Sequence, residues 1–152
     1  MAANSKRENI LVAFKALLEG LPSVKKVDRR QPTSPEDLRR VAGTQMPMVA
    51  MIGGVPQPKE HISGRGPGGV DVVISNLSVA LFVYFMDNAT ADSTLSDIMD
   101  DVWAKVYSDQ TLGFKYVTQI TISPNTEVAV WEPYVAFSMN IKITYHHTTG
   151  GI

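Results

Sequence analysis

The sequence contains no cysteine, which excludes disulfide bonds, thiol catalysis and zinc–thiolate sites. No apolar run is long enough to span a bilayer as a helix, and no apolar core of signal-peptide length follows the basic pair Lys6-Arg7. Neither positive nor negative charge dominates, because the formal net charge is -1 and no basic stripe stands out. A dedicated nucleic-acid binder is therefore not favoured, and we expect the chain to fold in a cytoplasm.

What the sequence does contain is typical of one globular domain. Its 152 residues are 44% hydrophobic and 19% charged, which is enough apolar material for a sizeable core. We find no internal repeat and no second domain, so residues 1–152 are treated as a single unit.

The first half of the chain predicts two helices and two strands before a long irregular segment. Ser5 and Glu8 form a capping-box pattern, and apolar residues recur behind it at helical spacing. Gly and Pro crowd residues 53–69 so densely that we expect no regular structure there, and a loop of that length is usually functional or disordered. The expected elements are a helix over 5–20, an exposed strand over 23–29, a short helix over 35–41, a strand over 47–52 and a loop over 53–69.

The second half predicts the centre of a sheet. Residues 70–87 alternate as a strand but are apolar on both faces, so a second layer or another subunit must cover the second face. A helix over 88–108 places Val102, Trp103 and Val106 on its apolar stripe. Residues 115–123 and 126–132 read as a hairpin around Pro124-Asn125, and residues 134–146 as a long final strand. The predicted class is α+β, with an antiparallel or mixed sheet and two main helices packed on one face.

No catalytic, cofactor or metal-binding constellation emerges from the residue types. The segment 64–69 is rich in glycine but lacks a following Gly-Lys-Ser/Thr, and a strand follows it rather than a helix. His146 and His147 are adjacent on a strand and point to opposite faces, so we interpret them, with His61, as solvated histidines. Asp97 and Asp101 share a helix face, where any amphipathic helix places its charges. We therefore expect no enzyme.

The layout of the chain resembles that of the bacteriophage tail terminator, or tail completion, family. Four stretches carry this resemblance: the N-terminal helix and charged strand over 10–30, the strand over 78–85 with the acidic helix ending Asp100-Asp101-Val102-Trp103, the break over 109–113, and the closing strand over 134–145. The resemblance covers nearly the whole chain, but residues 56–69 are longer and richer in glycine than the family pattern.

The resemblance implies a structural virion protein in the tail or neck. Such proteins form a hexameric ring on the last ring of the tail tube, end tube polymerisation and provide the surface that joins the head connector. The implied partners are further copies of the chain, the tail tube protein and the head–tail connector protein. DNA passes through the lumen without specific recognition, and no membrane is involved.

Candidate contact residues follow from this interpretation and from the apolar second face. A ring needs a heterologous interface, in which one patch meets a different patch on the neighbour. The candidates are Phe82, Tyr84 and Met86 for the subunit interface, His61, Arg65, Gly66 and Gly68 for the lumen or a ring face, and His146, His147 and Ile152 for a partner contact.

Two alternatives remain open. One is another head–tail connector, neck or tail-completion component of similar construction. The other belongs to a different class, a small ligand-binding domain or enzyme, and it would need a pocket with convergent polar groups. A site that brought His61, Arg65 and Asp71 together would favour this second alternative.

Overall fold

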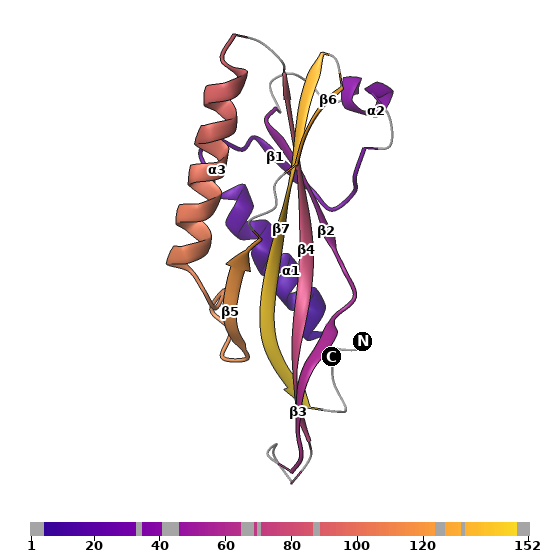
Figure 1. Cartoon of the computed structure of the whole chain (residues 1–152), viewed down its shortest axis with the longest axis vertical. Coiled ribbons are helices and arrows are strands. Elements are labelled where there is room, and N and C mark those ends of the chain that lie inside the picture. Colours follow the sequence, from indigo (N-terminus) through magenta and orange to yellow (C-terminus); the bar gives the residue numbers. More distant parts are fainter. Residues whose placement is uncertain are drawn as a thin grey trace.

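The protein is a mixed β-sheet with helices packed against it, in agreement with the predicted α+β class (Figure 1). The computed structural model describes residues 5–32, 35–40, 46–64, 69, 71–86, 89–123, 127–131 and 133–148. Within these residues the strand order is β1-β2-β4-β7-β5, while β3 also pairs with β4 and β6 with β7. No described helix has the length and hydropathy needed to cross a membrane.

Two long antiparallel strands form the centre of the sheet. β4 (Val72–Met86) and β7 (Tyr134–Thr148) each contain 15 residues and pair along their whole length. Asn76 lies within the ladder, where its side-chain oxygen accepts a hydrogen bond of 2.8 Å from the Thr144 hydroxyl of the facing strand. β2 (Met48–Gly53) extends the sheet antiparallel to β4, and β1 (Lys26–Asp28) pairs parallel with β2.

Both long helices cover the same face of this sheet, as predicted (Figure 1). They are α1 (Lys6–Glu19) and α3 (Ala91–Ser108). The Ser5 hydroxyl accepts a hydrogen bond from the Glu8 amide at 3.1 Å, which confirms the predicted N-cap. The main core lies between helices and sheet, and its central members are fully buried: Ile10, Leu11, Phe14, Leu18, Val79, Leu81, Ile98, Val102, Ile141 and Ile143.

The predicted loop over 53–69 is wrong in its first half. Residues Gln57–Ile62 form strand β3, antiparallel to the early part of β4. Among the described residues β3 pairs on one side only, so Pro58, which lacks an N–H, costs the ladder little at this edge. The pairing shifts register between Pro58 and Glu60. β3 therefore continues the line of β2, and with the ends of β4 and β7 it forms an arm beyond the helices (Figure 1).

The predicted hairpin between residues 115–123 and 126–132 is also wrong. β5 (Val117–Ile122) and β6 (Glu127–Trp131) both pair with β7 and not with each other. β7 is long enough for both, because β5 pairs with its second half, up to Tyr145, and β6 with its first half, up to Ser138. The turn predicted at residues 124 and 125 lies outside the described residues.

A second, smaller cluster lies on the sheet face opposite the long helices. Its buried members are Met46, Met48, Ala50, Tyr84 and Tyr134, with Phe82 and Ala136 partly buried against them. The short helix α2 (Pro35–Arg39) lies on this side of the sheet (Figure 1). The side chain of Gln31, which precedes α2, hydrogen-bonds to Tyr84. The apolar second face of β4 is therefore partly covered by the chain itself.

Gly53, the last residue of β2, is required by the close approach of α1. A Cβ at this position would lie 2.8 Å from Leu11 Cδ1 and 3.0 Å from Arg7 Nη2. Leu11 is fully buried and has little room to yield. Arg7 also donates hydrogen bonds of 3.0 Å to the carbonyl oxygens of Gly53 and Gly54, which fixes α1 to this junction.

We expect Gly53→Ala to lower the free energy of unfolding by about 1–3 kcal/mol, the usual cost of overpacking a core. Gly20→Ala is the matched control, because Gly20 has helical dihedral angles and its added Cβ would come no closer than 3.4 Å to another atom. Urea denaturation measures both variants. Equal stability of the two would contradict the packing constraint at Gly53.

Candidate functional site

The candidate interface residues on β4 differ in how far they are exposed. Tyr84 is 1% exposed, so its ring is covered within the single chain and is not available to a neighbour. Phe82 is partly buried against the same cluster. Met86 is 40% exposed at the end of the strand. Of the three residues, Met86 and part of Phe82 remain open to another molecule, so the predicted contact is narrower than the alternation pattern implied.

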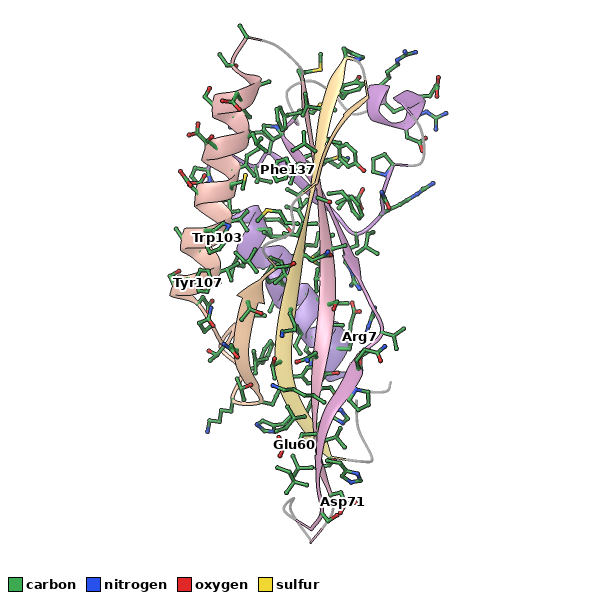
Figure 2. The ribbon with its side chains drawn as sticks, viewed as in Figure 1. Arg7, Glu60, Asp71, Trp103, Tyr107 and Phe137 are labelled. Atoms are coloured by element: carbon green, nitrogen blue, oxygen red, sulfur yellow. The ribbon has the colours of Figure 1, made fainter. Side chains whose placement is uncertain are left out.

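The tip of the β3–β4 arm brings two of the candidate polar residues together. His61 Nε2 lies 2.7 Å from Asp71 Oδ2, and the Gly64 amide donates to Asp71 Oδ1 at 2.9 Å. These bonds lower the pKa of the Asp71 carboxyl, the Gly64 amide contributing most and His61 next. Figure 2 places Asp71 at the far end of the arm. The candidates Arg65, Gly66 and Gly68 lie outside the described residues, so their part in this tip stays a prediction.

His61 and Asp71 are arranged to hold the turn rather than to perform chemistry. Both side chains are open to solvent, and the acid's second oxygen is occupied by a backbone amide that closes the turn. An exposed pair of this kind offers no water-excluded site for a substrate. Nowhere in the described part of the chain do three or more His, Asp or Glu side chains gather to hold a metal ion.

The two adjacent histidines of β7 point to opposite faces, as predicted, but His147 is not solvated. It is 7% exposed, and the prediction that it lies on the surface for a partner contact is wrong. Its Nδ1 lies 3.0 Å from the Thr148 carbonyl oxygen, and its Nε2 lies 3.0 Å from Ser75 Oγ. A carbonyl oxygen only accepts, so in the neutral ring Nδ1 carries the proton and Nε2 accepts from the Ser75 hydroxyl. The candidate Ile152 lies outside the described residues.

Ser75 and His147 have the spacing of a nucleophile and its base, but they are enclosed. Ser75 is 1% exposed, and a nucleophile must be reachable by its substrate. No acidic side chain orients the second ring nitrogen, since that nitrogen faces a backbone carbonyl. The arrangement suits a buried hydrogen bond that joins β4 to β7.

The uncovered part of the second sheet face carries small and polar side chains. Ser78 and Asn140 are exposed there, and Ala80 lies between them and the smaller cluster. An open hollow of about 580 Å³ lies at the end of β5, and its lining includes Ser78, Asn140 and Lys142. Among the described residues of that lining, Lys142 alone is ionisable. A hollow with one ionisable group lacks the paired acid and base of most hydrolytic sites.

Two aromatic side chains of α3 are exposed, although the sequence pattern predicted that one of them is buried. Trp103, assigned to the apolar stripe of the helix, is 42% exposed, and Tyr107 one turn later is 47% exposed. Their ring centroids are 5.3 Å apart. The i, i+4 spacing of the two aromatic residues predicts this contact, but their exposure follows from which face of α3 meets the sheet.

Comparison with known proteins gives little further guidance. No known family model and no curated protein matches the sequence. Among solved structures, a chain from a particle described as "Virion of native gene transfer agent (GTA) particle" aligns over 94% of this chain and 96% of its own length. The identity is 10% and the TM-score is 0.43. A likeness this distant does not establish a shared function.

The buried hydrogen bond between Ser75 and His147 can be tested by removing one partner. We expect Ser75→Ala to lower the free energy of unfolding by about 1–3 kcal/mol, because His147 Nε2 loses its donor in a buried position. Ser78→Ala on the exposed face of the same strand is the control, with an expected change within about 0.5 kcal/mol. If urea denaturation gave the same small effect for both variants, the bond would not contribute to stability.

The turn at the arm tip predicts a pH dependence. The folded pKa of Asp71 lies below the ordinary 3.8, so the carboxylate stabilises the turn at neutral pH and this contribution is lost as the pH falls through the folded pKa. The Gly64 amide resonance in NMR spectra should therefore shift with a midpoint below 3.8. In Asp71→Asn that titration should disappear. A midpoint above the ordinary value would contradict the hydrogen bonds described here.

Proposed function

We propose that this chain is a non-catalytic structural subunit of a phage-type virion. The observation that carries the proposal is the uncovered sheet face. Next to the smaller cluster this face is open and bears short side chains such as Ser78, Ala80 and Asn140. The described lining of its hollow contains one ionisable side chain, Lys142. A broad open surface suits contact with another protein, whereas ligand pockets enclose most of their ligand.

The free edges of the sheet support an assembly role. In the described part of the sheet β3 pairs on one side only, and β5 ends the strand order on the other flank. Unpaired strand edges expose backbone donors and acceptors that another chain can satisfy. β3 bears exposed Lys59 and Pro58, which discourage indiscriminate pairing and leave specific contacts possible.

More specifically, we propose a tail terminator role. The resemblance in layout suggests a ring of six copies that caps the tail tube, ends its polymerisation and offers the joining surface for the head connector. In this proposal the tail tube and connector proteins are the partners, and the arm with His61 at its tip faces the lumen or a ring face. DNA passes through the ring without being read.

The proposal predicts rings. Negative-stain electron microscopy of the purified chain should show closed rings with a central hole, and light scattering should give about six times the subunit mass. The same rings should bind purified tail tube. A strict monomer at high concentration, with and without tail tube, would contradict the proposal. Binding to the portal-side connector but not to the tube would instead indicate a neck component.

A further inference from the structure

The outer surface of α3 combines acidic side chains with exposed aromatic rings. The helix contains four aspartates and one lysine, a formal charge of -3. Asp100 is exposed and lies one turn before Trp103. None of the four aspartates forms an ion pair with another described residue. Figure 2 shows that Trp103 and Tyr107 are carried by α3, away from the sheet edge that β1 and β2 form.

Leaving these rings in water carries an energetic cost that a partner would remove. Trp103 and Tyr107 are about half covered, and each lies against the other. Burying aromatic area in a contact contributes roughly 25 cal/mol per Å². Trp and Tyr are also the residues that most often dominate interface energetics. The pair therefore forms an aromatic knob, defined here as Trp103 and Tyr107 with the adjacent Asp100.

The opposite charge gathers around β1 and α2. Residues 25–40 contain six basic and three acidic side chains, a formal charge of +3. Arg29 is satisfied by hydrogen bonds to Glu8. Arg39 is exposed and makes no ion pair with another described residue, and Arg40 is 82% exposed with a long contact of 3.8 Å to Asp37. The guanidinium groups of Arg39 and Arg40 are therefore largely available to an acidic group of another molecule.

These cations line a hollow together with two apolar residues. A cavity of about 230 Å³ is lined by Lys26, Arg30 and Arg40, with Pro32 and Met48 as apolar members and Asp28, Gln31 and Asp37 completing it. Pockets for small molecules usually begin at about 300 Å³, so this one suits a side chain better than a ligand. Met48 also belongs to the smaller cluster that contains Phe82 and Tyr84. We name this hollow the basic socket.

The aromatic knob and the basic socket lie on opposite sides of the sheet. α3 covers one face, while α2 lies on the other (Figure 1). A single chain cannot bring the two together, so a knob that enters the socket must come from another copy of the chain. Two different patches that meet between identical chains make a heterologous contact, which closes into a ring when the rotation permits.

We propose that the aromatic knob of one copy of this chain seats in the basic socket of the next copy. In this contact Trp103 meets Pro32 at the mouth of the socket, Arg30 or Arg40 lies over an aromatic face as a cation–π pair, and Asp100 pairs with the remaining guanidinium. The lining of the socket carries three basic and two acidic side chains, and this excess of positive charge opposite the acidic surface of α3 favours head-to-tail over head-to-head encounters. This inference rests on the proposed function and specifies its subunit contact.

Charge reversal tests the contact. Asp100→Lys and the double variant Arg30→Glu/Arg40→Glu should each raise the concentration needed for half assembly by at least tenfold, because like charges then face each other. Glu19→Lys on α1 makes the same charge change as Asp100→Lys at a site that is exposed and outside both regions, and it should assemble like the parent chain. Circular dichroism and thermal unfolding check that every variant folds.

Mixing the two reversed variants gives the sharper result. In an alternating ring, Lys introduced at position 100 of one variant meets the glutamates of the other, which restores the ion pair but not the cation–π pair. Every second contact in that ring is the one the parent chain makes. An equimolar mixture should therefore restore rings that neither variant forms alone. Trp103→Ala should weaken assembly and not be rescued by either partner.

The outcomes separate this inference from the proposed function. If the parent chain forms rings and both reversed variants do so equally well, the contact is wrong while the ring stands. If reversed variants fail alone and also fail when mixed, the pairing of knob with socket is wrong. If the parent chain forms no assembly with or without tail tube, both proposals fall together.

Discussion

The pairing of β4 with β7 is the interaction on which the rest of the structure depends. Their ladder runs from Val72 and Thr148 to Met86 and Tyr134 without a register shift. Every strand but β1 pairs with one of these two, and β1 joins through β2. The helices cover one face of the ladder and the smaller cluster lies on the other. A one-residue slip would exchange these faces and expose the core, so the register determines core and surface together.

The long elements could be predicted because their patterns are strong and local. Helical spacing identified α1 and α3, and alternation identified β4 and β7. β3 was missed because Gly and Pro were taken to exclude strand structure, while an edge strand tolerates Pro58 when its N–H is not needed. The pairing of β5 and β6 was missed because a hairpin is the simplest local solution, and only the length of β7 allows two strands in line on one edge.

The surface was harder to predict than the fold, since a pattern identifies two faces of an element but not what covers each. Alternation placed Tyr84 on a second face, and the chain itself covers Tyr84 there through the smaller cluster and Gln31. His147 was taken as a surface residue, but its facing strand supplies Ser75 as a partner. Trp103 lies at the border of the apolar stripe of α3, where a small rotation of the helix about its axis decides whether the side chain is buried or exposed. The basic socket is lined by one stretch of the chain, residues 26–40, together with Met48 of β2, and its shape arises only when this stretch folds back on the sheet.

The continuous central ladder also has a mechanical consequence. Hydrogen bonds in an antiparallel pair lie perpendicular to the strands, so a pull along the molecule's long axis loads many of them at once in shear. The arm that carries His61 and Asp71 is an extension of the same two strands that pass beneath α1 and α3 (Figure 1). A force applied at the tip of the arm is therefore transmitted by the paired strands β4 and β7 to the far end of the subunit. Their pairing has no register shift along the way that could act as a hinge.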